Sequence, residues 1–513
     1  MLTRTDPANL IPADDGRPKA VVIGAGLGGL ATAMRLGAKG FAVTVLERLD
    51  RPGGRGAAIH LDGHRFDLGP TIVTVPQLLR SLWRDCGRDF DEDVDLRPMD
   101  PFYEIRWPDG SAFRASGTEG AMEREIARLS PDDLPGFARF LDDSERRYAF
   151  GFETLGRKAM SDFWAFLKVL PTFGLLRADR SVYGHAARRF RDERLRMAFS
   201  FHPLLIGGDP FHVTSIYTLV SHLERAFGVH YAMGGVAAIA RAMAEAVEDQ
   251  GGLIRYGAEV DEIVVENGAA AGVRLAGGET IPAPIVVSNA DAGHTYDRLL
   301  RRRKKRRWTA GRLRRSRWSM GLVVWHFGTR GTRGLWPDVG HHTILCGADY
   351  RGEVADVFLR GRLAEDLSLY VHRPTVTDPG AAPEGDDTFY ALSPVPHLGH
   401  DAPIDWAREA ERHRLRIEET LERCLLPGLR ARVTASMLFT PETFRDRYLS
   451  PHGAGFSLEP RILQSGWFRP HNVSEEARGL YLVGAGTHPG AGLPGVVASA
   501  EVVADLIEAA GVR

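Results

Sequence analysis

The segment that most constrains the fold lies near the N-terminus and reads KAVVIGAGLGGL, residues 19–30. A short apolar run leads into glycines at GxGxxG spacing, and a segment with helical apolar periodicity follows. A second apolar run, FAVTVLE (41–47), ends in an acidic residue. A strand, a glycine turn, a helix and a strand-terminal acid in this register predict a β-α-β unit.

Such a unit predicts a dinucleotide site. Gly24 allows the tight turn, Gly26 lets a diphosphate approach the backbone, and Gly29 lets helix and strand pack closely. The helix N-terminus offers free N–H groups and a positive dipole end to phosphate. Glu47 can accept hydrogen bonds from the ribose hydroxyls, and Ala25 lies within the glycine turn. A glycine-rich turn without a chemical role is the alternative.

The following motif, RPGGRG (51–56), points to a flavin. Arg55 can neutralise a diphosphate, although a solvated loop arginine is the alternative. The order GxGxxG, strand-terminal Glu, GGR resembles the flavoprotein superfamily of amine oxidases, protoporphyrinogen oxidases and carotenoid desaturases. The resemblance implies FAD as cofactor, with Arg48 and Gly54 among its contacts.

Two further segments extend this resemblance. FDLGPT (66–71) contains a rigid turn, and a similar segment runs under the flavin ring in that superfamily. Asp67 within it is either a turn-capping carboxylate or a catalytic group. In related flavoproteins the valine that corresponds to Val260 lies against the adenine. The contacts that these segments predict are Gly69, Pro70, Thr71 and Val260.

The segment GAGTHPGAGLPGV (484–496) lies between an apolar run, GLYLVG (479–484), and a helical segment. This order predicts a second strand-loop-helix crossing whose backbone approaches the flavin, with the helix beginning near residues 495–496. His488 is either functional or structural. The contacts expected here are Gly486, Gly495 and Val496.

The predicted fold class is α/β, with a discontinuous Rossmann-like FAD-binding domain of the flavin amine oxidase type. This domain comprises residues 18–95, 226–297 and 475–513, and residues 1–17 are expected to be a flexible tail. Residues 96–225 and 298–474 form a mixed helical and β substrate domain. Its aromatic-rich helical part predicts either an ordinary core or the lining of an apolar tunnel.

Composition excludes several classes. The 65 basic and 66 acidic residues give a net charge of -1, so no nucleic-acid partner is expected. The 3 cysteines include no CxxC pair, and no metal site is predicted. No apolar run reaches about 18 residues, so no transmembrane helix is expected. The basic run 297–318 is either a solvated helix face or a contact with an anionic membrane surface.

Later blocks resemble the bacterial-type phytoene desaturases, most closely those of purple phototrophic bacteria. Among them are SVYGHAARR (181–189), FSFHPLLIGGDPF (199–211), FTPETFRDRYLSPHGAGFSLEP (439–460) and QSGWFRPHN (464–472). The resemblance runs from about residue 19 to about residue 507. It implies a peripheral enzyme at the cytoplasmic face of the membrane. That enzyme would dehydrogenate phytoene and partly desaturated carotenes stepwise to neurosporene or lycopene, with hydride passing to flavin N5.

The catalytic base stays open at this stage. Five residues of the middle region are candidates, each of which can equally be structural or solvated: Glu153, Asp162, His202, Asp209 and His212. The absence of a second GxGxxG after a strand favours quinone or oxygen as electron acceptor over a nicotinamide. Two alternatives remain for the whole chain. One is a related carotenoid flavoenzyme, such as a later desaturase or carotene isomerase, and the other is a non-catalytic lipid-binding protein on the same fold.

Overall fold

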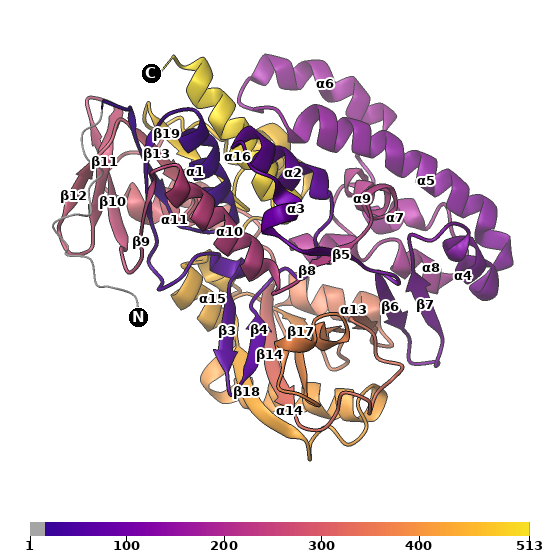
Figure 1. The fold of residues 1–513 in the computed structure, drawn as a ribbon. Helices are drawn as coiled ribbons and strands as arrows, with labels where there is room; N and C mark the ends of the chain where they lie inside the picture. Colours follow the sequence, from indigo (N-terminus) through magenta and orange to yellow (C-terminus); the bar gives the residue numbers. More distant parts are fainter. Residues whose placement is uncertain (1–15, 512–513) are drawn as a thin grey trace.

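The computed structural model describes residues 16–511, so residues 1–15 of the expected tail lie outside the described residues. The protein has an α/β fold, as predicted (Figure 1). A five-stranded sheet has the order β19-β13-β1-β2-β9, with all neighbouring strands parallel. Its strands come from three separate stretches of the chain: β1 (Lys19–Ile23), β2 (Ala42–Leu46), β9 (Leu253–Arg255), β13 (Ile285–Ser288) and β19 (Leu480–Leu482).

Three helices pack beside this sheet because each presents an apolar stripe. In α1 (Leu27–Ala38), Leu30 and Met34 are fully buried. This helix contacts both α10 (Val236–Asp249) and α16 (Leu493–Ala509). The shared apolar core therefore fixes the turn before α1 and the loop before α16 on the same side of the sheet.

The stretch 281–291 is divided between two sheets. Its first part belongs to β12 (Thr280–Pro282), which pairs with β11 (Ala269–Leu275) in a three-stranded antiparallel sheet with β10 (Val260–Glu266). Its second part is β13 of the parallel sheet. Pro282 and Pro284 flank the division, and neither can donate a backbone N–H to continue a ladder.

A seven-stranded mixed sheet forms the lower part of the molecule in Figure 1, in the order β18-β14-β17-β16-β15-β6-β7. Alternate residues of β14 face opposite sides, since side chains in a strand have a period of two. Trp325 and Phe327 pack with the residues of α14 (Trp406–Cys424), whereas Leu322 and Val324 line a cavity. The remaining strands are β6 (Tyr103–Arg106), β7 (Ala112–Ala115), β14 (Gly321–Thr329), β15 (His342–Leu345), β16 (Leu369–His372), β17 (Asp387–Val395) and β18 (Val433–Phe439).

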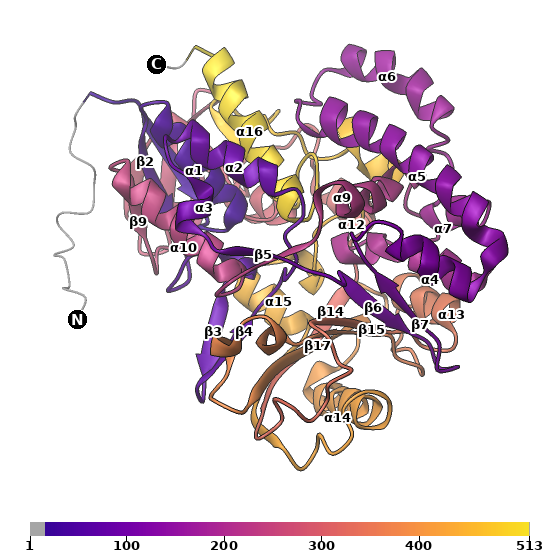
Figure 2. The ribbon, with the colours of Figure 1, turned by 45° about the vertical axis from the view of Figure 1, so that its right-hand side comes forward.

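A helical layer lies over the other side of this cavity, at the upper right of Figures 1 and 2. Its longest members are α5 (Leu134–Tyr148), α6 (Phe163–Leu175) and α9 (Leu219–Phe227). A short 3₁₀ helix, His202–Ile206, precedes α9. Among the helices within residues 16–511, none has the length and apolarity needed to cross a bilayer.

Candidate cofactor and substrate site

A single large cavity of about 950 Å³ joins the parallel sheet to the helical layer. Its volume lies near the upper end of the range for small-molecule and cofactor sites. Most of the residues predicted from the sequence to contact the cofactor line its wall: Gly24, Gly26, Glu47, Arg48, Gly54, Arg55, Gly69, Pro70, Thr71, Val260, Gly486, Gly495 and Val496. Segments far apart in sequence therefore meet around one space.

The other two predicted residues support the wall from behind. The Ala25 N–H donates a 2.7 Å hydrogen bond to Glu47 Oε2, which holds the strand-terminal acid against the glycine turn. Gly24 has φ +92°, the left-handed region that favours glycine. A Cβ placed on Gly29 would lie 2.1 Å from the Gly24 carbonyl oxygen, so the first helical turn has no room for a side chain.

Asn289 joins the two glycine-rich loops, and sequence reasoning did not single it out. It follows β13 directly, and its side chain lies against the turn before α1, where a Cβ on Gly26 would come 2.8 Å from Asn289 Nδ2. A Cβ on Gly484 would come 2.7 Å from its Oδ1. The signal in the sequence was a polar residue at the carboxyl end of an apolar parallel strand, where open α/β sheets bind ligands.

Two helices begin at the cavity with no side-chain cap and no acidic residue in the first turn. They are α1, after Gly26, and α16, after Gly492. The second begins at Leu493, slightly earlier than expected, with Pro494 in its first turn, where proline is tolerated. Their uncapped N–H groups and positive dipole ends give this part of the cavity an anion-binding character.

Arg55 adds a full positive charge to the same wall. The side chain is half-buried in the wall, and desolvation lowers the pKa of its guanidinium against the nearby charge of Asp291. It donates to Ser450 Oγ, while its Nε has no partner, and no carboxylate within residues 16–511 forms an ion pair with it. The planar donor fork of an arginine matches a phosphate, so this side chain is suited to a diphosphate.

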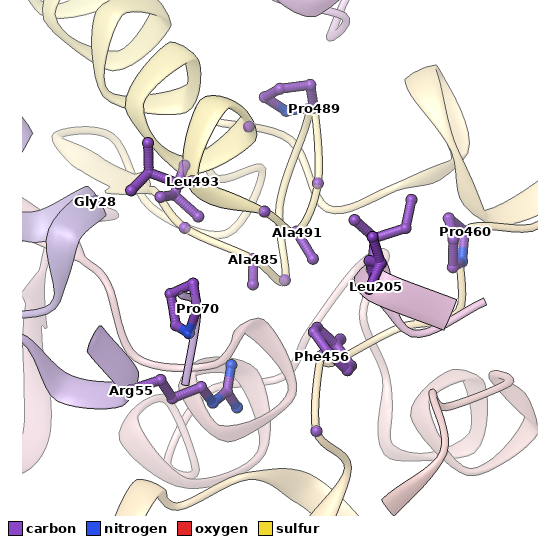
Figure 3. A pocket seen from close by; sticks show the side chains of 18 of the residues that line it. Gly28, Arg55, Pro70, Leu205, Phe456, Pro460, Ala485, Pro489, Ala491 and Leu493 are labelled. Atoms are coloured by element: carbon purple, nitrogen blue, oxygen red, sulfur yellow. The ribbon is translucent and has the colours of Figure 1, made fainter. Parts of the chain in front are cut away.

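These features fit FAD. The glycine turn, the two open helix ends and Arg55 together provide room and positive potential for a diphosphate. Glu47 lies at the wall beside them, and its carboxylate is oriented by the N–H groups of Ala25 and Leu49. In Figure 3, Arg55 and Pro70 lie on one side of the cavity, with the loop of Ala485 and Ala491 close by.

The rest of the cavity is an apolar arm. In Figure 3, Leu205, Phe456 and Pro460 lie beside the C-terminal glycine-rich loop, so the apolar wall begins next to the cofactor end. Further along, the helical layer and the seven-stranded sheet supply the lining: Phe152, Leu155, Phe166, Leu167, Leu204, Leu219, Leu223, Leu322, Val324 and Leu392. This arm offers a hydrocarbon chain a path with few polar contacts.

One rim of the arm is open to solvent. Phe163 and Leu170 of α6 are 42% and 41% exposed and also line the cavity. Ile462 and Leu463 share both properties. The Trp467 ring bridges the two segments, with its centroid 5.0 Å from that of Phe163. We call these residues, together with the neighbouring exposed Trp164, the apolar rim.

None of the five candidate bases lies on the cavity wall. Glu153 is exposed beside Arg157, and Asp162 caps α6 by accepting a 2.8 Å hydrogen bond from the Trp164 N–H. Asp209 and His212 bond to each other. His202 is buried behind the wall and contacts a cavity-lining acid, Glu224, that the sequence reasoning missed.

A buried histidine cluster supports the turn that contains Thr71. His342 Nδ1 lies 2.7 Å from the Tyr370 hydroxyl, which lies 2.6 Å from Thr71 Oγ1. His341 and His372 join through their Nε2 atoms, 3.0 Å apart. Burial lowers the pKa of all three histidines, that of His341 to about 3, so they are neutral. Their ligand atoms lie within 4.8 Å of one another, the one such grouping in residues 16–511, although no metal was predicted.

Comparisons with known proteins identify the protein family to which this chain belongs. The family model described as flavin containing amine oxidoreductase matches residues 27–507. Solved structures agree in fold: an oxidoreductase from Methanosarcina mazei superposes with a TM-score of 0.64 at 20% identity, covering 95% of this chain and 100% of that one. A putrescine oxidase gives 0.62 at 16%, covering 96% and 100%. The chain belongs to the flavin-containing amine oxidoreductase family, and its cofactor is FAD.

Relatives narrow this class further. A protein of Cereibacter sphaeroides named phytoene desaturase (neurosporene-forming) is 66% identical, over 97% of this chain and 96% of its own. One of the same name from Rhodobacter capsulatus is 64% identical, over 96% and 94%. A lycopene-forming phytoene desaturase from Paracoccus is 46% identical, over 95% and 97%. The predicted resemblance to the phytoene desaturases of purple phototrophic bacteria is confirmed.

Proposed function

We propose that the protein is an FAD-dependent desaturase that dehydrogenates phytoene and partly desaturated carotenes stepwise, with neurosporene as the expected main product. The main observation that supports this proposal is one cavity that joins a diphosphate-binding end to an apolar arm. The names of the 66% and 64% identical relatives support neurosporene over lycopene. A hydrocarbon substrate has no group to hold by hydrogen bonds, so its orientation must come from the shape of this arm.

When bound, FAD supplies the hydride acceptor. In our proposal the chain's own residues hold the cofactor and exclude water. The glycine turn and Arg55 bind the diphosphate, Glu47 binds the ribose, and the turn of Gly69–Thr71 supports the ring. We assign the cofactor domain to residues 18–95, 226–297 and 475–513, and the substrate domain to residues 96–225 and 298–474.

We further propose that the apolar rim docks on a membrane surface, from which the hydrocarbon substrate enters. The basic run 297–318, for which contact with an anionic membrane surface was one of two alternatives, lies beside this rim. The Arg307 guanidinium lies 4.3 Å from the Trp467 ring centroid, and Arg312 donates to the Phe468 carbonyl. Apolar side chains next to cations are the combination that binds an anionic bilayer surface. A quinone in the same membrane, or oxygen, is the proposed electron acceptor.

The test is product analysis after incubating the FAD-supplemented protein with phytoene in liposomes. We expect phytoene to be consumed and neurosporene to accumulate. If phytoene is untouched while a later carotenoid is consumed or isomerised, the related-flavoenzyme alternative replaces this proposal. A colourless protein that cannot be reconstituted with FAD would instead support a lipid-binding role.

A further inference from the structure

One carboxylate stands within the apolar arm of the cavity. Within residues 16–511 the cavity wall contains four acidic residues, and three of them follow or precede strands at the cofactor end: Glu47, Glu259 and Asp291. The fourth, Glu224, belongs to α9, whose Leu219, Val220 and Leu223 also line the arm. A buried acid among apolar neighbours requires a reason, because burying a charge is costly.

The side chain of Glu224 is held by two side-chain donors. Its Oε2 accepts hydrogen bonds from the Tyr103 hydroxyl at 3.0 Å and from His202 Nε2 at 3.2 Å. Burial and the nearby Glu224 raise the pKa of Tyr103, so the phenol stays protonated and donates. Both bonds fall on Oε2, which leaves Oε1 without either of them. No lysine or arginine within residues 16–511 forms an ion pair with this carboxylate.

The short helix that carries His202 reaches the cofactor end. His202 begins the short 3₁₀ helix, and the last residue of that helix, Ile206, reaches the C-terminal glycine-rich loop. A Cβ on Gly492 would lie 3.5 Å from Ile206 Cγ2. Leu205 of this helix appears beside Phe456 and the loop of Ala491 in Figure 3. The wall that carries Glu224 is therefore continuous with the place where the cofactor loop meets the apolar arm.

We propose that Glu224 is the catalytic base that accepts the proton lost in each desaturation, an inference that rests on the proposed function. Each desaturation step removes a hydride and a proton from adjacent carbons of the substrate, and the flavin is the acceptor of the hydride. The C–H bond at the second carbon breaks, its electron pair becomes the new π bond, and its proton forms an O–H bond with Glu224 Oε1. A carboxylate in an apolar wall is suited to this step because it is poorly solvated.

The structure also provides a way for the proton to leave. A second cavity of about 20 Å³ lies behind the wall, and its lining combines apolar side chains with polar residues: Tyr103, Ser116, His202, Ser221, Glu224 and Arg225. This volume accommodates about one water molecule, and its lining is polar enough to hold it. The proton passes from Glu224 through this space toward the exposed Arg225 side, away from the hydrocarbon.

The test replaces Glu224 by Gln, which preserves size and an acceptor for Tyr103 but removes the base. We expect desaturation of phytoene in the liposome assay to fall about 100-fold or more, the usual contribution of general acid–base catalysis. FAD content and the amount of phytoene bound per protein should stay unchanged. Glu224→Asp should recover part of the rate. Glu153→Gln removes an exposed carboxylate off the cavity wall and serves as the matched control, with an expected rate equal to wild type.

Two outcomes overturn the inference while wild-type activity on phytoene persists. One is a Glu224→Gln rate within about threefold of wild type, far below the expected contribution of a base. The other is a rate that falls only in proportion to lost FAD or lost phytoene binding, which would assign Glu224 a structural role. If the wild-type protein itself leaves phytoene unchanged, the proposed function fails and the inference falls with it.

Discussion

Replacing Leu463 by Ser tests whether the apolar rim meets the membrane. Leu463 is 67% exposed, so the change removes apolar surface without opening a core cavity. Full burial of a leucine side chain is worth about 1.5–3 kcal/mol, and scaling by the exposed fraction leaves about 1–2 kcal/mol for transfer into the bilayer interface. At about 1.4 kcal/mol per tenfold, vesicle partitioning should fall roughly 5- to 30-fold.

The assay is co-flotation of the FAD-loaded protein with vesicles of acidic lipid at low and high salt. The matched control is Leu415→Ser on α14, a 44% exposed leucine in a helix at the opposite end of the molecule from α6 (Figure 1). This control should bind like wild type, and both variants should retain FAD. Added salt should weaken binding of every variant, since the basic run contributes charge. Equal losses for the two variants, or no loss for Leu463→Ser, would refute docking through the rim.

Three further changes probe the cofactor end. Gly29→Ala forces a Cβ against the Gly24 carbonyl, so it should lower the free energy of unfolding by about 1–3 kcal/mol and cause loss of FAD. The control Gly174→Ala places a Cβ where no atom lies within 4 Å, so it should not destabilise the protein. Equal shifts of the melting temperature for the two variants would contradict the predicted clash at Gly29. Arg55→Ala removes a charge-assisted contact worth about 1.5–3 kcal/mol, so the dissociation constant of FAD measured by equilibrium dialysis should rise roughly 10- to 100-fold. An unchanged dissociation constant would exclude Arg55 from diphosphate binding. Burial raises the pKa of Asp67 from 3.8 to about 6, so the native state favours the protonated carboxyl. The stability of the protein should be greatest below the pKa of Asp67 in the unfolded state, and it should fall by up to about 3 kcal/mol as the pH rises through the pKa of Asp67 in the folded state. In denaturant melts at several pH values, Asp67→Asn should lose this dependence of stability on pH. An unchanged pH dependence in the variant would assign the effect to another group.

The sequence by itself determined the cofactor end. Glycines at fixed spacing after a strand, followed by a strand-terminal acid, specify a local backbone geometry, and Gly24, Gly26 and Glu47 all lie on the wall of one cavity. Local geometry of this kind depends on residues close in sequence, so it can be read without the tertiary structure. The matched family and the close relatives agree with the resemblance drawn from these and later motifs.

The tertiary structure decided what surrounds the substrate. Helical periodicity in a sequence indicates that one face of a helix is apolar. It does not indicate whether that face packs in a core, lines a cavity or meets solvent. Glu153 and Asp162 therefore looked as eligible as any acid, and only the fold turns them outward while it places Glu224 on the cavity wall. Tyr103 and Glu224 are 121 positions apart, so their hydrogen bond exists only because the seven-stranded sheet and the helical layer pack around the same space.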